Sequence, residues 1–408
     1  MILPKLRFTG FNEPWSETSL GKISSFITSG SRDWAQYYSD CGDKFIRMTN
    51  LVRDGITLNL SDLKFVRLPE NSNEGKRTAL QHHDILISIT AELGKLGWVP
   101  DDLGTAYINQ HTALVRPNLS IASSKFVANL LSTKKYNNIL NQQNDSGAKS
   151  GLNLSTIKNF GFYAPNKIEQ TKIADFLSYV DEKITLLNRQ YDLLCQYKKG
   201  MMQKIFSQEV RFKDESGKYF IEWVKTSLEN VCDVRDGTHS SPIAQLDGYP
   251  LITSKNLIGS RGIDFDNVTY ISKKDYDEIN KRSIVNEGDI LFSMIGTIGN
   301  LALVKDAGFA IKNVGLIKEN SKLKNNFLFF YLQFLVGSGY FELIKSGNTQ
   351  KFISLTTLRQ LEIPCPIINE QLIISNFFCS FDKKIAIKKA ELDKLKTWKQ
   401  GLLQQMFI

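Results

Sequence analysis

The chain has 408 residues, of which 42% are hydrophobic and 23% are charged, and its formal net charge is +9. This composition excludes an intrinsically disordered chain and allows two or three folded domains with ordinary cores. The positive charge, together with an aromatic fraction of 11%, favours a polyanionic partner, with nucleic acid ahead of a membrane surface.

The cysteines and the N-terminal segment indicate a cellular compartment. The five cysteines form no CxxC motif and do not combine with the four histidines in a ligand pattern, so neither a disulfide framework nor a zinc site is predicted. The N-terminus lacks the basic and apolar regions of a signal peptide. The longest apolar stretch, 290–304, is interrupted by glycines and is too short for a bilayer of about 30 Å. We therefore expect a cytoplasmic protein.

Two parts of the chain have the pattern of mixed α+β modules. Short runs rich in β-branched and aromatic residues alternate there with turn residues, which predicts strands of twisted sheets. The runs are 44–53, 84–91 and 111–117 in the first part, and 250–259, 268–273 and the stretch from Asp289 onward in the second. The stretch from Asp289 predicts two core strands around a glycine turn. Helices are predicted at 125–131 and 326–335.

A long heptad segment follows each module. Pro165 and Pro366 stand just before these segments, and proline is disfavoured inside helices, so they mark the helix starts. A spacing of alternately four and three residues between apolar positions predicts coiled-coil helices whose seams can bury each other. The seam residues are Ile173, Leu177, Val180, Ile184, Leu187, Tyr191 and Leu194 in the first helix, and Ile374, Phe378, Phe381, Ile385, Leu392 and Leu395 in the second. Lys198 interrupts the first seam, and Lys388 and Lys399 interrupt the second.

The two halves of the chain are copies of each other. Pro165, Glu169 and Gln170 return 201 positions later as Pro366, Glu370 and Gln371, and this offset holds through the helices. The offset is larger in the modules: 208 from Trp15 to Trp223, 206 from Asn50 to Asn256, and 205 from Asp84 to Asp289. Insertions and deletions therefore occur in the modules, whereas the helix length is constrained. Two copies are too few for a solenoid.

These patterns predict a division of the chain and a role for the helices. The predicted parts are a first module at 1–165, a central spacer helix at 166–206, a linker at 207–222, a second module at 223–365 and a C-terminal spacer helix at 366–408. At about 1.5 Å per residue, the central helix would be close to 60 Å long. The twofold character of the repeat suggests antiparallel packing of the two helices as an intramolecular ruler. The alternative is a generic coiled coil that dimerises the chain with a second copy.

Motifs for catalysis are missing from the sequence. There is no Walker loop and no glycine-rich cofactor loop, and the nearest string to an adenine-methyltransferase tetrapeptide, Asn12-Glu13-Pro14-Trp15, lacks the second proline. The histidines His82, His83, His111 and His239 stand outside any metalloprotease-like context. The sequence therefore predicts a binding protein without cofactor or metal rather than an enzyme.

The residues that could contact nucleic acid occur in loops at equivalent places in the two copies. Polar and aromatic side chains gather in the first loop of each module, and Ser-Gly with a lysine precedes each long helix; such side chains contact base edges and phosphates. The candidates are Arg32, Trp34, Gln36, Tyr37, Tyr38, Lys76, Arg77 and Lys149 in the first module, and Arg235, Thr238, His239, Ser240, Lys255, Asn256, Arg261, Asn348, Thr349, Gln350 and Lys351 in the second. For any single residue, a solvated surface role is an equal alternative.

The chain closely resembles the specificity subunit of type I restriction-modification systems over essentially its whole length. The resemblance lies in RFTGFNEPW, TSLGKISSF, GDILFSMIGTIGNLALV, SGNTQKFISLTTLRQLEIPCP and the twice-used PxxxEQ helix that ends in QKIF or QQMF. It implies two pseudo-twofold-related target recognition domains, each reading one half of a split double-stranded DNA site, separated by long antiparallel coiled-coil helices. It also implies that the helices dock two modification (methyltransferase) subunits, and that methyl transfer and cleavage belong to modification and restriction subunits.

The two modules differ in sequence almost everywhere outside these landmarks, which predicts two different half-sites and an asymmetric target. The competing hypothesis is a structural adaptor, a coiled-coil protein whose two domains bind other proteins. Salt-sensitive, sequence-dependent binding to duplex DNA would distinguish the two hypotheses.

Overall fold

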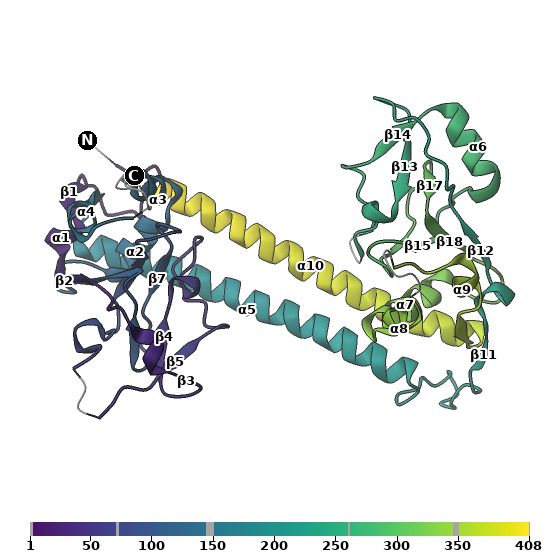
Figure 1. Ribbon diagram of the computed structural model, residues 1–408, viewed down its shortest axis with the longest axis horizontal. Coiled ribbons are helices and arrows are strands. Elements are labelled where there is room, and N and C mark those ends of the chain that lie inside the picture. Colours follow the sequence, from purple (N-terminus) through teal and green to yellow (C-terminus); the bar gives the residue numbers. More distant parts are fainter. Residues whose placement is uncertain (1–2, 71–72, 144–150, 260–261, 346–350, 408) are drawn as a thin grey trace. The chain divides into compact units, whose positions relative to one another are not determined.

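The computed structural model describes residues 3–70, 73–143, 151–259, 262–345 and 351–407. The chain forms two compact units, Met1–Asn188 with Ala390–Ile408 as unit 1, and Arg189–Lys389 as unit 2. Each unit contains one module and one half of each long helix, α5 (Lys167–Phe206) and α10 (Ile368–Met406) (Figure 1).

The first module, in unit 1, is built on two four-stranded sheets and a two-stranded ribbon. The first sheet has the order β2 (Ser24–Ser29), β9 (Thr112–Pro117), β6 (Ile85–Ser88), β7 (Leu96–Trp98), and its strands are antiparallel. The second has the order β3 (Tyr38–Ser39), β5 (Lys64–Val66), β4 (Asp43–Ile46), β8 (Ala106–Ile108), with β4 and β8 parallel. The ribbon pairs β1 (Ser16–Ser19) with β10 (Gly161–Ala164), directly before α5.

Short helices cover the first sheet of this module. They are α1 (Leu20–Ile23), α2 (Ser124–Ser132), α3 (Lys134–Gln142) and α4 (Leu154–Asn159), with 3-10 turns η1 (Trp34–Tyr37), η2 (Met48–Asn50) and η3 (Lys76–Thr78). Ile85 of β6, Phe126 of α2 and Leu177 of α5 are buried in one cluster. The predicted helix at 125–131 is confirmed as α2.

The second module, in unit 2, repeats this architecture. A four-stranded antiparallel sheet has the order β12 (Asp233–Asp236), β18 (Val314–Lys318), β15 (Ile290–Ser293), β16 (Leu301–Leu303). A three-stranded sheet has the order β14 (Thr269–Ile271), β13 (Tyr249–Thr253), β17 (Ala310–Lys312), with β13 and β17 parallel. β11 (Val224–Ser227) pairs with β19 (Glu362–Cys365) before α10.

The remaining helices of the second module are α6 (Lys273–Ser283), α7 (Asn325–Gly337), α8 (Tyr340–Ile344) and α9 (Leu355–Arg359), with 3-10 turns η4 (Leu228–Asn230) and η5 (Ser254–Asn256). Phe292 of β15, Phe327 of α7 and Phe378 of α10 are buried in one cluster with Phe206 at the end of α5. The predicted helix at 326–335 is confirmed as α7. The strands β15 and β16 confirm the predicted strand pair around a glycine turn, in which Gly296 and Gly299 have positive φ angles.

Two predicted strands are too long, for the same reason in both modules. The runs 44–53 and 250–259 end as strands at Ile46 and Thr253, and a 3-10 turn follows each. The side chain of buried Asn50 accepts the backbone N–H of Arg47 at 2.9 Å, and that of Asn256 accepts the N–H of Thr253 at 3.0 Å. An asparagine that satisfies the backbone locally competes with the strand ladder.

The twice-used Glu-Gln pair has a structural explanation. Gln170 accepts the backbone N–H of Ser123, the N-cap of α2, at 3.0 Å, and donates to the Pro165 carbonyl at 2.8 Å. In unit 2, Gln371 accepts the N–H of Lys324 at 2.8 Å and donates to the Pro366 carbonyl at 2.7 Å. Each buried glutamine therefore joins the start of a long helix to a helix of its own module.

The preceding glutamates are held differently in the two units. Arg7 donates from two nitrogens to the two carboxylate oxygens of Glu169, at 2.7 Å each. Glu370 accepts instead from the indole N–H of Trp223 at 2.9 Å, and burial raises the pKa of this carboxyl. The repeat therefore keeps a glutamate at this position in both units, but the residue that hydrogen-bonds to it differs.

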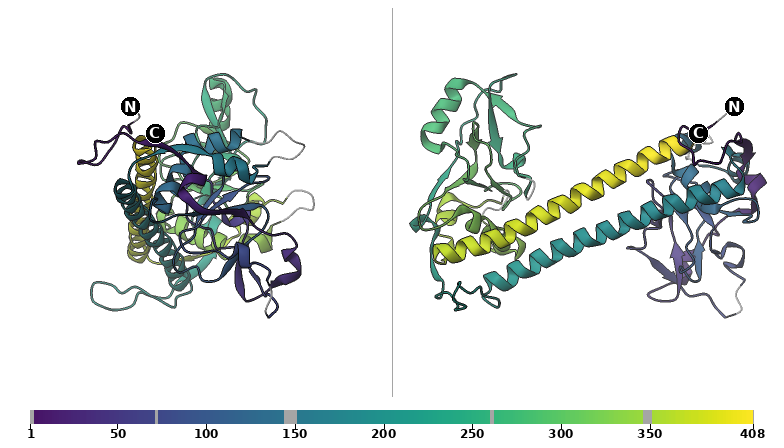
Figure 2. Two further views of the ribbon diagram at one scale, coloured as in Figure 1. Left: turned by 90° about the vertical axis from the view of Figure 1, so that its left-hand side faces the viewer. Right: turned by 180° about the vertical axis from the view of Figure 1, so that it is seen from behind.

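The two long helices are antiparallel. In unit 2, the ammonium of Lys389 lies over the Tyr191 ring, and the rings of Tyr197 and Phe381 lie 5.3 Å apart, so positions later in α5 meet positions earlier in α10. Figure 2 shows each helix as one continuous element. The α+β fold class with two related modules and two long antiparallel helices is therefore confirmed.

Two of the lysines that interrupt the seams form matching ion pairs. Lys198 Nζ lies 2.6 Å from Asp382 Oδ1 in unit 2, and Lys399 Nζ lies 2.5 Å from Asp181 Oδ1 in unit 1. Both lysine side chains are only 13% exposed. Lys198 and Lys399 differ by the repeat offset of 201 positions, as do Asp181 and Asp382. The interruption is thus a polar contact across the helix pair that occurs once in each unit.

All the seam residues named from the sequence are shielded from solvent. The buried ones are Ile173, Leu177, Val180, Leu187, Ile374, Phe378 and Leu392, and the half-buried ones are Ile184, Tyr191, Leu194, Phe381, Ile385 and Leu395. A lysine placed in such a seam favours the one helix register in which it finds its partner.

Removing the lysine of one ion pair should destabilise unit 2. In Lys198→Ala, Asp382 loses its ion-pair partner beside an apolar seam, and we expect the free energy of unfolding to fall by roughly 1 to 2 kcal/mol. Urea unfolding followed by circular dichroism measures this change. The matched control is Lys199→Ala, whose side chain is exposed. The exchanged pair Lys198→Asp with Asp382→Lys should recover part of the loss, and equal stability of both alanine variants would contradict the role of the pair.

Candidate nucleic-acid interface

One of the sequence candidates, His239, is held by three other side chains at the end of β12 in unit 2. His239 Nε2 lies 3.0 Å from Oδ2 of Asp236, and its Nδ1 lies 2.7 Å from Oδ1 of Asn313. Asp236 is buried and also accepts a hydrogen bond from Arg282 at the end of α6. The His239 side chain is nevertheless 67% exposed. The residues Asp236, His239, Arg282 and Asn313, called the His239 cluster below, thus hold an imidazole in one orientation toward solvent.

The backbone beneath the His239 cluster requires particular residues. A Cβ on Gly237 would lie 2.3 Å from the Ile311 carbonyl oxygen, so only glycine fits. The N–H of Thr238 donates to the Ile311 carbonyl, and the N–H of Asn313 donates to the Thr238 carbonyl. Asn313 has a φ of 54°, which few residues other than glycine and asparagine tolerate. The strand ends therefore fix where His239 and Asn313 meet.

The neighbouring candidates differ in how free their polar groups are. Arg235 is paired with Asp233 at 2.6 Å and donates to the Arg282 carbonyl at 2.9 Å, and the hydrogen bond that it donates to Asp233 raises the pKa of this guanidinium. Thr238 is half-buried and accepts the N–H of Ser240, which is exposed. Arg235 therefore supports the loop as well as carrying charge, whereas His239 and Ser240 are the more accessible groups.

In the first module, the polar-aromatic loop divides into an inner and an outer part. Trp34 is buried, with its ring 4.9 Å from that of Phe45 and 5.2 Å from that of Tyr107. It belongs to the core and is withdrawn from the candidate contacts, because a buried ring cannot reach a base. Arg32, Gln36 and Tyr38 are exposed and Tyr37 is half-buried.

Other candidates lie apart from these two loops. Lys76 and Arg77, on η3, are exposed; Lys76 donates to Asn73 and Arg77 to Thr28. Lys255 is exposed, but the adjacent Asn256 is buried as the cap described above and is also withdrawn. Lys351 is exposed at the start of the chain that leads to α9. Lys149, Arg261, Asn348, Thr349 and Gln350 lie outside the described residues.

Sequence reasoning named none of the three side chains that surround His239. Asn313 and Arg282 lie far from it in the sequence and reach it only through the pairing of β12 with β18 and the end of α6. Lys312, which donates to Ser241 Oγ at 2.6 Å, was missed for the same reason. The available signal was Asp236-Gly237, an acidic residue followed by a glycine at a strand end.

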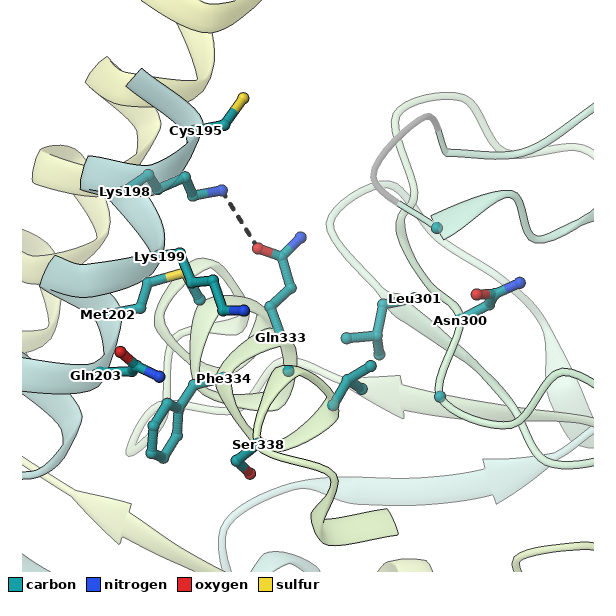
Figure 3. Close-up of a pocket in the computed structure, with 14 residues that line it drawn as sticks. Cys195, Lys198, Lys199, Met202, Gln203, Asn300, Leu301, Gln333, Phe334 and Ser338 are labelled. Atoms are coloured by element: carbon teal, nitrogen blue, oxygen red, sulfur yellow. Dashed lines mark hydrogen bonds between the residues drawn. The ribbon is translucent and has the colours of Figure 1, made fainter. Parts of the chain in front are cut away.

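A pocket of about 320 Å³ in unit 2 lies beside the C-terminal half of α5 (Figure 3). Met202, Leu301, Phe334 and Val336 form its apolar lining, and Lys198 donates to Gln333 at its edge at 3.4 Å. None of its described lining residues is Asp, Glu or His. At the sequence-equivalent end of α10, a cleft in unit 1 is lined by the basic side chains of Arg53, Lys134, Lys396 and Lys399 and by the acidic side chains of Asp54 and Asp181. The equivalent places therefore differ in chemistry.

The rest of the described chain shows the same character. Among the residues that the structure describes, no three His, Cys, Asp or Glu side chains are placed to hold a metal ion. Burial raises the pKa of the Cys232 thiol to about 12, far from that of a reactive thiolate. The described helices include none with the length and apolarity needed to cross a membrane.

A family model and two relatives match the chain. The model of the type I restriction modification DNA specificity domain matches twice, at residues 12–195 and 221–397. The putative type I restriction enzyme MjaX specificity subunit of Methanocaldococcus jannaschii is 27% identical over 302 residues, covering 71% of this chain and 68% of the relative. The MjaVIII specificity subunit of the same organism is 26% identical over 379 residues, covering 88% and 80%.

Two solved structures share the fold. The S subunit of a type I restriction-modification system from M. genitalium has a TM-score of 0.62 at 15% identity and covers 100% of this chain and 99% of its own. A chain from a structure on complex assembly and conformational transition of the type I R-M system has a TM-score of 0.56 at 18% identity and covers 97% and 98%. At these identities the likeness extends to the fold alone.

Proposed function

Because the chain belongs to the type I restriction-modification DNA specificity family, we propose that it is the non-catalytic DNA-recognition subunit of such a complex. The observation that carries this proposal is that the modules share their structural elements but differ in their exposed loops. Both modules have the same kind of four-stranded antiparallel sheet, the buried glutamine and the asparagine cap. The loop after β12 carries His239 in one module, whereas the loop after β2 carries Arg32 and Gln36 and leads to Tyr38 in the other. Equivalent frames with different exposed side chains suit two different half-sites.

The residue ranges follow the sequence division. The target recognition domains are 1–165 and 223–365, the spacer helices are 166–206 and 366–408, and 207–222 is the linker between the halves. Exposed basic residues such as Arg32, Lys76 and Lys255 supply salt-dependent affinity by releasing counterions from phosphates. Side chains at base edges supply discrimination of about 1 to 3 kcal/mol for each good contact. The complex acts in the cytoplasm, where its DNA is.

The helices are also the docking surface for two modification subunits, through which restriction subunits join the complex. Two identical partners need equivalent surfaces, and the repeat provides them. Leu186 and Ile387, 201 positions apart, are 50% and 58% exposed, and Tyr197 and Trp398, with the same offset, are 53% and 48% exposed. Such large apolar side chains at matched exposed positions are typical of partner contacts.

Methylome sequencing tests the proposed function. A host that expresses the chain with its neighbouring modification subunit should gain a methylated motif in two different parts with a fixed unspecified gap. A host with the modification subunit alone is the control. If the complex forms and no new motif appears, the adaptor hypothesis replaces this one.

Changing His239 should affect one half of the motif only. In His239→Ala, the cluster loses its exposed imidazole ring, and Asp236 and Asn313 lose their shared partner. We therefore expect discrimination at one position of the second domain's half-site to fall roughly 5- to 150-fold. Competition binding with duplexes altered at single positions measures it. His82→Ala, which removes an exposed histidine of the first module, is the matched control. Uniform weakening at every position of both half-sites would contradict base readout by His239.

Shortening both spacer helices should shorten the gap in the motif. Removing seven residues, one heptad, from the middle of each helix preserves both seams and would shift the domains by about 10 Å, or roughly three base-pair steps of about 3.4 Å. Methylome sequencing of the variant should then show the same half-sites with a smaller gap. An unchanged gap in a folded, active complex would refute the ruler.

A further inference from the structure

The loop that leads from the His239 cluster to β13 carries two large aliphatic side chains in water. Ile243 is 81% exposed and Leu246 is 102% exposed, and neither belongs to a hydrophobic cluster of the described chain. Burying side chains of this size stabilises a fold, so leaving two of them outside forgoes stabilisation. A single exposed aliphatic residue needs no explanation, but two within four positions beside a polar cluster do.

The loop is nevertheless fixed at several points along its length. Lys312 Nζ donates to Ser241 Oγ at 2.6 Å, and the backbone N–H of Gln245, between the two aliphatic residues, donates to the Tyr270 carbonyl at 2.9 Å. A Cβ on Gly248 would lie 2.4 Å from the Ile271 carbonyl oxygen, so the loop lies close against β14 there. These contacts fix the backbone that carries the exposed side chains of Ile243 and Leu246. Little backbone conformational entropy would therefore be lost when the two side chains bind a partner.

From this geometry we propose that Ile243 and Leu246 make apolar contacts with bases of the half-site read by the second target recognition domain. The proposal rests on the proposed function. Aliphatic side chains contact thymine methyl groups in the major groove or enter a base step from the minor groove, and both contacts bury apolar surface against bases. The adjacent Ser240 is exposed and supplies a hydroxyl that can hydrogen-bond to a base edge, and the exposed imidazole ring of His239 lies beside it.

Comparison with the first module favours DNA over a protein as the partner that contacts Ile243 and Leu246. The corresponding loop of that module has its tryptophan, Trp34, in the core, and its exposed apolar side chain is Tyr38, at 47%. Two identical modification subunits would need the same apolar feature in both copies. Two half-sites of different sequence would not, so a feature present in one copy fits the DNA.

The test compares the complete complex carrying Ile243→Ser and Leu246→Ser with the wild-type complex. The double variant should bind a duplex with both half-sites at least roughly tenfold more weakly, because two apolar contacts are lost. Its affinity for a duplex with a scrambled second half-site, and the slope of its affinity with salt, should stay unchanged, because no charge is altered. Leu119→Ser with Ile121→Ser, at aliphatic residues of the first module that are 45% and 50% exposed, is the matched control.

Two additional arms identify the contact. If uracil in place of thymine in the second half-site weakens the wild-type complex but not the variant, the contact is with thymine methyl groups; if uracil has no effect while the variant is still weakened, the side chains occupy a base step. Unchanged affinity of the variant would overturn the proposal while the two-part methylation motif of the wild type still supports the proposed function. Loss of assembly with modification subunits would also overturn it, and would assign the loop to a protein interface.

Discussion

The antiparallel contact between α5 and α10 is the constraint on which the rest of the molecule depends. Each long helix contributes one half to each compact unit, so neither module is complete without parts of both. An apolar seam alone would allow the helices to shift by a heptad with little loss of burial. The ion pairs Lys198–Asp382 and Lys399–Asp181 remove that freedom, because a shift would leave two largely buried ammonium groups without their carboxylates. This accounts for a constant repeat offset in the helices beside a variable one in the modules.

The junction between helix and module is fixed just as firmly. Gln170 and Gln371 have buried side chains, and each satisfies a half-buried backbone N–H of a module and a buried carbonyl at the start of a long helix. Losing such a side chain would leave both backbone groups without this partner, and leaving a buried carbonyl unpaired costs more than the hydrogen bond itself contributes. A rigid junction transmits the helix register to the module. The glutamates beside them show that the same place tolerates an exchange of partner, from Arg7 to Trp223.

The sequence predicts those features that depend on periodicity and repetition. The heptad seams, α2, α7 and the glycine turn between β15 and β16 could be predicted from local patterns, because each follows from residues close together in the chain, and the antiparallel helix pair follows from the repeat. The runs at 44–53 and 250–259 were assigned too long because a single asparagine ended each strand. Trp34 is a candidate contact by composition, which does not distinguish an aromatic residue at the surface of a loop from one that folds back onto Phe45 and Tyr107. Asn313 and Arg282 reach His239 only through tertiary structure, which no local pattern reports.

The segment that leads from β5 to β6 in the first module, and from β14 to β15 in the second, shows how the same sheets can carry two different surfaces. It runs from Val66 to Ile85 in the first module and from Ile271 to Ile290 in the second, and the two spans have the same length. In the first module it contains the short turn η3, which presents Lys76 and Arg77; in the second it forms α6, whose last turn supplies Arg282 to Asp236. The flanking strands hold their register in both modules, so the segment can change its secondary structure without moving the sheets. Sequence change in such a segment alters which groups are exposed, while the sheets of the module remain the same.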